Sequence, residues 1–165
     1  MFSLKTITQD SIPRALDKAE RYRLLNEPHF AESICLDILA LDPDHQQALI
    51  IYLLALTDQF GENRAGGVAR AQAVVARLRG EYERNYYTGI LHERRGKARL
   101  AAGGLGAGPA AFEMLRDAMR WYELAQSLHP PGNDDAILRY NTCVRLIQDY
   151  RLEPTDHERH DNPLE

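Results

Sequence analysis

The chain has 165 residues, of which 27% are charged and 44% hydrophobic, and its formal net charge is −4. A chain of this length forms one domain that buries about 70% of the surface exposed when it is unfolded. With a mean hydropathy of −0.45, the composition is that of a globular protein and excludes a disordered or membrane-embedded one. The acidic balance disfavours nucleic-acid binding, which usually needs a basic surface.

The N-terminal stretch MFSLKTITQDSIPRAL lacks the uninterrupted apolar core of a signal peptide. The longest apolar run, ALIIYLLAL at 48–56, is too short to span a bilayer. We therefore expect a cytoplasmic protein. Cys35 and Cys143 both lie in helical, apolar patterns, so we expect them to be small core residues without redox chemistry.

Helix start and stop signals dominate the chain, and no segment has a convincing strand pattern. The first predicted helix follows Asp10 or Ser11 as N-cap, carries Pro13 in its first turn and ends at Asn26. A second helix begins at Pro28, where the missing N–H of proline is tolerated, and runs to the LDP sequence at 41–43.

The third predicted helix is capped by Asp42, has Pro43 in its first turn and runs to about Phe60. A fourth spans roughly 64–78, weakened at its start by two glycines, and a fifth spans about 81–101.

A sixth predicted helix covers about 110–128, and a seventh, capped by Asn133, ends near Tyr150. Residues 151–165 have almost no apolar content, so we expect a mobile polar tail.

Two segments share one pattern: AESICLDILALDP at 31–43 and AMRWYELAQSLHP at 118–130. In each, an alanine is followed at helical intervals by three apolar residues and then by a proline. The matched pairs are Ala31 with Ala118, Cys35 with Tyr122, Ile38 with Ala125 and Leu41 with Leu128. The pattern predicts one buried helical stripe that occurs twice.

This pattern resembles the tetratricopeptide repeat (TPR), a family of helix-turn-helix units of about 34 residues. Over residues 12–45, Ala19 stands at the family's small position of helix A, Tyr22 at its aromatic position and Pro43 at its final proline. A second unit would cover 46–79, and a third would place Gly89 at the small position. The resemblance implies an all-α fold of about seven helices in antiparallel pairs, forming a short right-handed superhelix over residues 1–150.

The stretch AGGLGAGP at 102–109 contains four glycines. It lacks the Gly-Lys-Ser/Thr ending of a phosphate-binding P-loop, and no strand precedes it as a dinucleotide site would require. Regular repeat spacing would put the helix-B alanine at Ala101, whereas the matching alanine is Ala118. We therefore interpret 102–109 as a flexible connector inside an insertion.

Four basic residues lie close together in HERRGKAR at 92–99: Arg94, Arg95, Lys97 and Arg99. Their side chains point to different faces of one helix, which also carries Glu81, Glu83 and Glu93. We interpret this 94–99 basic cluster as a solvated face, with an acidic-partner patch as the alternative.

The tail sequence DHERHD at 156–161 places two histidines three residues apart, but nothing supplies a fixed third metal ligand. The sequence contains no recognisable pairing of a nucleophile with a base. We therefore expect no metal, no cofactor and no enzymatic activity.

The TPR resemblance implies a concave surface, lined mainly by the first helix of each pair, that binds a protein or peptide. The partner-binding residues that it implies are Glu20, Arg23, Gln47, Leu54, Asp58, Tyr86, Arg94, Asn141 and Arg145. We therefore expect a non-catalytic adaptor. Two alternatives stay open: a homodimer paired through the apolar run at 48–56, and a nucleotide- or RNA-binding domain that uses Tyr86, Tyr87 and the 94–99 basic cluster.

Overall fold

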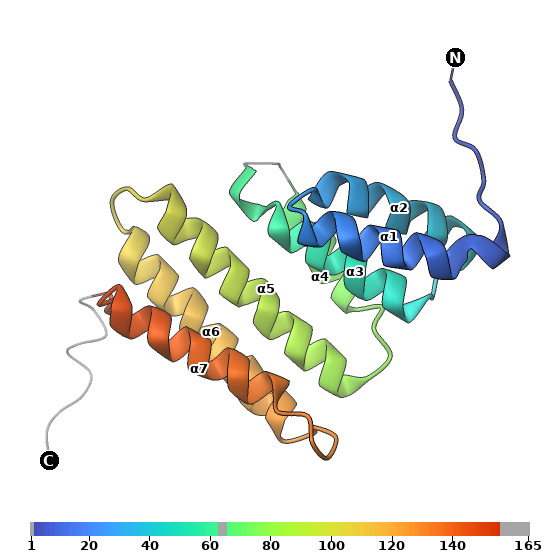
Figure 1. Ribbon diagram of the computed structural model, residues 1–165. Coiled ribbons are helices and arrows are strands. Elements are labelled where there is room, and N and C mark those ends of the chain that lie inside the picture. The colour runs from blue at the N-terminus through green and yellow to red at the C-terminus, as the bar shows by residue number, and fades with distance from the viewer. Residues whose placement is uncertain (1, 63–65, 156–165) are drawn as a thin grey trace, which may run out of the picture. The chain divides into compact units, whose positions relative to one another are not determined.

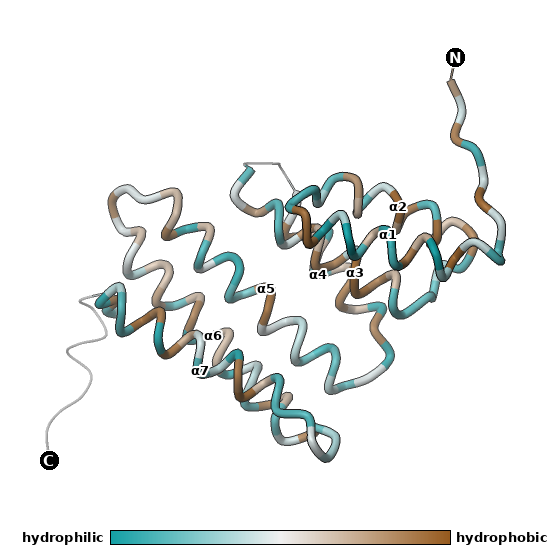
Figure 2. Tube along the Cα trace, in the orientation of Figure 1, coloured by the Kyte–Doolittle hydropathy of each residue, from teal (hydrophilic) through white to brown (hydrophobic). Residues whose placement is uncertain are grey.

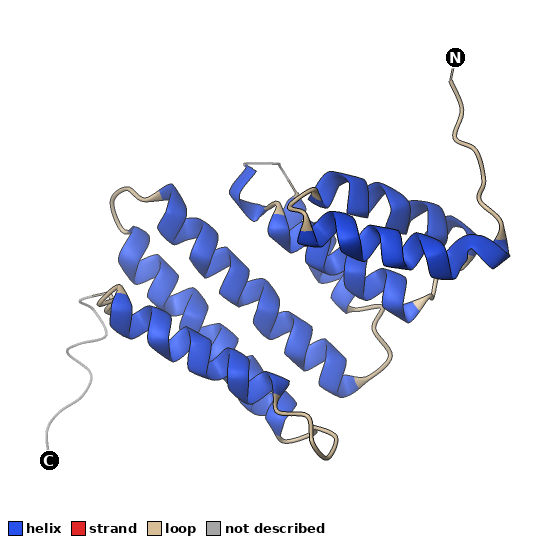
Figure 3. Ribbon diagram, in the orientation of Figure 1, coloured by secondary structure: helices blue, strands red, loops and turns tan. Residues whose placement is uncertain are grey.

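A computed structural model describes residues 2–62 and 66–155 of the chain (Figure 1). Over these residues the chain forms seven α-helices and two short 3-10 turns, without a strand (Figure 3). The chain divides into two compact units, Met1–Arg79 and Gly80–Glu165, called unit 1 and unit 2 below. The all-α prediction is confirmed, while the single repeat domain over 1–150 and its superhelical form stay predictions.

Unit 1 contains four helices and both 3-10 turns. In chain order these are η1 (Gln9–Ser11), α1 (Ile12–Leu24), α2 (Pro28–Leu41), α3 (Gln46–Asp58), η2 (Phe60–Glu62) and α4 (Gly67–Val75). Each helix packs against the next one along the chain, and α1 also touches α3. Helix α3 contributes more buried residues than any other helix of this unit, and the hydropathy colouring of Figure 2 shows its apolar character beside the hydrophilic α1.

The turn between α1 and α2 follows from Asn26, whose φ of 60° is left-handed. The N–H of Glu27 donates to the carbonyl of Tyr22 at 2.9 Å, and that of Asn26 donates to Arg23 at 3.0 Å. This is the Schellman pattern that ends a helix, and asparagine enters the left-handed region more readily than most residues. The predicted stop at Asn26 and the predicted start at Pro28 are therefore confirmed.

The predicted start of α3 at Asp42 is wrong. Asp42 is the C-cap of α2, and its carboxylate accepts a hydrogen bond from the N–H of Asp44 at 3.2 Å. This local turn uses the side chain that would otherwise cap a helix, so Pro43 lies between the helices. Instead His45 caps α3, its Nδ1 accepting from the N–H of Ala48 at 3.3 Å.

The end of α3 and the bounds of α4 also differ from prediction. Helix α3 ends at Asp58 and gives way to the 3-10 turn η2. Helix α4 begins at Gly67, the second glycine of the pair that weakens its predicted start, and ends at Val75 rather than Leu78. Its predicted first residue, Arg64, lies outside the described residues.

Unit 2 contains α5 (Glu81–Ala102), α6 (Ala107–Gln126) and α7 (Asp135–Asp149). Helices α5 and α6 have 22 and 20 residues, against 13 and 14 in α1 and α2. Helix α7 packs mainly against α6 and also touches α5. The residues that TPR spacing would count as an insertion therefore lie mostly in these two longer helices.

The predicted connector over 102–109 is in fact a turn of four residues, 103–106. Three of its glycines have φ values of 66°, 84° and 72°, a region that glycine enters without steric cost. Arg99 closes the turn by donating to the carbonyls of Gly103 at 2.7 Å and Leu105 at 3.1 Å. Residues 107–109 belong to α6, because proline is tolerated in the first turn of a helix.

The twofold buried stripe is confirmed over three of its four pairs. Ala31, Cys35, Ile38, Ala118, Tyr122 and Ala125 are all 0% exposed. The fourth pair, Leu41 and Leu128, is partly exposed or exposed because it lies at the helix ends. Cys143 is buried as predicted.

Gly89 lies where α5 packs so tightly on Tyr122 of α6 that a larger residue has no space. A Cβ atom at this position would lie 2.5 Å from Cε1 of Tyr122, which is shorter than any real contact. The residue that the TPR resemblance places at a small position therefore faces the largest fully buried side chain of the described chain.

The C-terminal part of unit 2 agrees with prediction at the end of α7 and differs before and after it. The N-cap is Asp134 rather than the predicted Asn133, whose side chain accepts from the N–H of Asp135 at 3.0 Å. Helix α7 ends at Asp149, directly before Tyr150. Leu152 and Pro154 are partly buried, so residues 151–155 are not the fully solvated tail that the composition predicts. Residues 156–165, including DHERHD, lie outside the described residues.

Candidate functional site

The nine residues predicted to bind a partner are divided between the two units. Unit 1 holds Glu20, Arg23, Gln47, Leu54 and Asp58, and unit 2 holds Tyr86, Arg94, Asn141 and Arg145.

In unit 1, Arg23 and Asp58 meet across α1 and α3. Nε of Arg23 donates to Oδ2 of Asp58 at 2.9 Å, and the two side chains are 18% and 15% exposed. Each residue lies at the C-terminal end of its helix, so the pair indicates that α1 and α3 run in the same direction. Helix α2 connects them along the chain and packs against both. The TPR resemblance places both residues on one surface, and their role in partner binding stays a prediction.

Helix α3 is buried on most sides, but one face is partly open. Within the run at 48–56, only Ile50 and Leu54 are partly exposed. Gln47 is exposed on the same face, because positions 47, 50, 54 and 58 follow helical spacing. On α1, exposed Glu20 lies one turn before Arg23. We call Glu20, Arg23, Gln47, Ile50, Leu54 and Asp58 together the α1–α3 face.

The homodimer alternative rested on an exposed apolar strip in residues 48–56. Seven of these nine side chains are buried, so most of the run forms core. Only Ile50 and Leu54 stay partly exposed in it, and the homodimer alternative stays a prediction.

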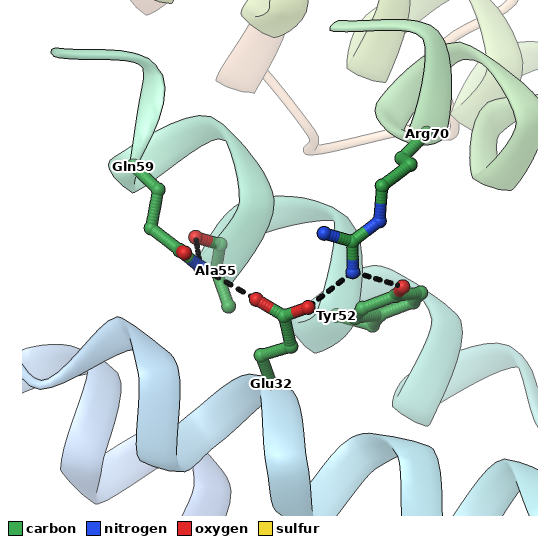
Figure 4. A network of polar contacts seen from close by, with 5 residues as sticks. All are labelled: Glu32, Tyr52, Ala55, Gln59 and Arg70. Carbon is green, nitrogen blue, oxygen red and sulfur yellow. Dashed lines mark hydrogen bonds and ion pairs between the residues drawn. The ribbon is translucent and has the colours of Figure 1, made fainter. Parts of the chain in front are cut away.

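A polar network joins α2, α3 and α4 (Figure 4). Glu32 is only 9% exposed and accepts from Nε2 of Gln59 at 2.9 Å. Arg70 contacts the other carboxylate oxygen of Glu32 and donates to the hydroxyl of Tyr52 at 2.9 Å. Nε2 of Gln59 also donates to the carbonyl of Ala55 at 3.0 Å. The sequence gives no sign of this network, because its contacts among Glu32, Gln59, Arg70 and Tyr52 join residues 18 to 38 positions apart along the chain.

The charges of this network stabilise each other. Burial raises the pKa of Glu32, but the hydrogen bonds from Gln59 and Arg70 lower it by more, so the net pKa lies below its ordinary value. The hydrogen bonds with Glu32 and Tyr52 raise the pKa of Arg70 further. A carboxylate held ionised in this way is suited to fixing helices and poorly suited to proton transfer.

Comparison with family models, curated proteins and solved structures finds no match. The resemblance to the TPR therefore stays a prediction.

In unit 2, the most buried charge is Glu93, which the sequence pattern assigns to a solvated face. This assignment is wrong, because Glu93 is 0% exposed. Its carboxylate accepts from the hydroxyl of Tyr122 at 2.7 Å and from Nη1 of Arg139 at 3.1 Å. Glu93 lies on the stripe formed with Gly89 and Gly96, both buried, and this spacing was the available signal for its burial.

The aromatic residues of the nucleotide-binding alternative are used for packing within unit 2. The ring of Tyr86 stacks on Tyr82 with centroids 5.8 Å apart and meets Tyr87 edge-on at 5.1 Å. Burial raises the pKa of Tyr87 to about 12. Arg99, one of the four residues of the 94–99 basic cluster, also closes the glycine turn. The nucleotide- or RNA-binding alternative stays a prediction.

The other predicted partner-binding residues of unit 2 lie on two helices and differ in exposure. Asn141 is partly buried and Arg145 is exposed, one turn apart on α7, while Arg94 is partly buried on α5. Their role in partner binding stays a prediction.

Residues 2–62 and 66–155 contain no group of three or more His, Cys, Asp or Glu side chains placed to hold a metal ion. None of their helices combines the length and the apolar character that crossing a membrane requires.

Proposed function

We propose that this protein is a non-catalytic, TPR-like adaptor that binds a peptide or partner helix on the α1–α3 face. The observation that carries the proposal is the partly exposed pair Ile50 and Leu54 on a helix that is otherwise core. Apolar anchors with a polar rim are the usual arrangement of helix-in-groove recognition. Glu20, Gln47 and the Arg23–Asp58 ion pair supply such a rim.

The packing order of the helices supports the repeat scaffold. In both units the first helix packs on the second, the second packs on the third, and the first also touches the third. In repeat proteins this order gives the first and third helices a shared surface that is used for binding.

The rim also offers specific hydrogen bonding. Arg23 uses Nε in its contact with Asp58, and a guanidinium has five N–H donors. The Nη groups therefore suit a backbone carbonyl or a carboxylate of a bound segment.

The proposal is tested by selecting binding peptides from a displayed random library against the full chain. The affinity of each selected peptide is then measured for the wild type, for the Leu54→Asp variant and for the matched control Leu36→Asp. The control changes an exposed leucine on α2. We expect Leu54→Asp to weaken binding at least about tenfold and Leu36→Asp to leave it unchanged. Equal binding to both variants, or no enriched peptide, would overturn the proposal.

A second variant tests the same face in case Leu54→Asp does not fold. The double variant Glu20→Lys with Gln47→Lys changes only exposed side chains, so its stability should stay close to that of the wild type. Altered peptide affinity in this variant, at unchanged thermal stability, would support the same face.

A further inference from the structure

The first and third helices of unit 2 leave an apolar hollow between their C-terminal halves. It has a volume of about 220 Å³ and is lined by Lys97, Leu100, Ala101, Leu146 and Tyr150. The lining residues come from α5 and α7. We call these five residues the α5–α7 pocket.

The α5–α7 pocket differs from the corresponding place in unit 1. There the C-terminal ends of α1 and α3 are joined by the Arg23–Asp58 ion pair. In unit 2, the residues of α5 that line the pocket lie in the part of the helix that exceeds the length of α1. This additional part of α5 therefore forms one wall of the pocket.

The chemistry of the pocket is apolar with one positive charge. Leu100 and Leu146 are partly exposed, and Tyr150 is 62% exposed although it is large and aromatic. Lys97 is exposed and has no carboxylate partner among the described residues. The nearby charges on α7 are Arg145 and Asp149, which are both exposed.

Size and charge together indicate the occupant. A cavity of about 150 Å³ lined by Leu, Ile and Phe side chains is known to hold benzene, so this pocket is large enough for one aromatic or leucine side chain. An ammonium group at the rim favours a carboxylate next to that side chain.

We propose that the α5–α7 pocket is a second peptide-binding site, which takes a large apolar side chain of a partner segment and pairs Lys97 with an adjacent aspartate or glutamate. This site lies entirely within unit 2 and does not depend on the proposed role of the α1–α3 face. The two sites are therefore tested by separate variants.

The test is an NMR titration of the ¹⁵N-labelled full chain with the capped dipeptide Ac-Phe-Glu-NH2, in which both chain ends are neutral. We expect millimolar affinity, with shifts at the amides of Lys97, Leu100 and Leu146. The analogues Ac-Ala-Glu-NH2 and Ac-Phe-Gln-NH2 should bind at least about tenfold and about threefold more weakly. Added salt should reduce the difference between the glutamate and glutamine peptides.

The variants are Leu146→Asp and Lys97→Glu, with Leu138→Asp and Arg120→Glu as matched controls on exposed helix positions. Leu146→Asp should abolish the shifts, and Lys97→Glu should weaken binding, whereas both controls should bind as the wild type does. The Lys97→Glu change lies on an exposed side chain and keeps the test valid if Leu146→Asp does not fold. No shifts at 10 mM, which corresponds to about 3 kcal/mol of binding free energy, would overturn the proposal. Equal shifts with Ac-Ala-Glu-NH2, or unchanged shifts in both variants, would overturn it too.

Discussion

Arg23 and Asp58 form an ion pair 2.9 Å long that joins the C-terminal ends of two parallel helices. Both side chains are mostly buried, so the pair is less screened by solvent than a surface pair. It fixes α1 beside α3 and thereby sets the width of the α1–α3 face.

The strength of this pair is measurable by a double-mutant cycle. We expect Arg23→Ala and Asp58→Ala to be coupled by about 0.5–1 kcal/mol in the free energy of unfolding. Urea denaturation of the wild type, both single variants and the double variant gives this value. Strictly additive effects would show that the contact does not stabilise the fold.

Gly89→Ala should reverse the usual effect of this substitution. In a helix interior alanine is normally favoured over glycine by about 1 kcal/mol, but here the new methyl group would meet the ring of Tyr122 at 2.5 Å. We expect a loss of about 1–3 kcal/mol in unfolding free energy from overpacking.

The matched control for this substitution is Gly67→Ala in α4. There the nearest atoms are 3.9 Å away on Phe60, so stability should be unchanged or slightly increased. Urea denaturation of both variants compares the two sites. A stabilised Gly89→Ala protein would contradict the close packing of α5 on α6.

The Glu32 network predicts a loss of stability in acid. The pKa of Glu32 is lowered from its ordinary value of 4.5. Its contribution is therefore fully present above about that pH and is lost as the pH falls through the lower folded value. Urea denaturation between about pH 3 and 6 should show a steeper decline for the wild type than for Glu32→Gln. Parallel curves would mean that the carboxylate is not stabilised in its ionised form.

Both cysteines should react slowly in the native protein. Burial, with a smaller contribution from Glu32, raises the pKa of Cys35 to about 12, and burial, with Glu93, raises that of Cys143 to about 12. The thiolate is the reactive form. At about pH 8, Ellman's reagent should therefore modify them only as fast as the protein opens, and quickly in denaturant. Rapid modification of either thiol under native conditions would place it at the surface.

Much of the fold could be predicted because its signals are local. Proline at Pro28, the left-handed Asn26 and the spacing of the buried stripe each act through neighbours in the sequence. The predictions failed where one local sequence pattern is compatible with two different structures. Asp42 served a turn instead of a helix cap, and the glycine stretch became a short turn because the helices on either side continued into it.

The candidate site was harder to predict, because its polar contacts join residues distant in the sequence. The TPR resemblance placed Arg23 and Asp58 on one surface, and the structure brings them together. Glu93 was missed because charge alone was taken to mean exposure, although its helical spacing from Gly89 indicated the buried side. The α5–α7 pocket has no sequence motif, since it depends on how far the lengthened α5 extends beside α7.

The most direct test of the proposed function is an NMR titration of the full chain with a peptide selected for binding to it. We expect the largest amide shifts on the α1–α3 face, at Glu20, Gln47 and Leu54, and we expect them to disappear in Leu54→Asp but to persist in Leu36→Asp. Shifts confined to other helices, or unchanged in Leu54→Asp, would contradict the proposed function.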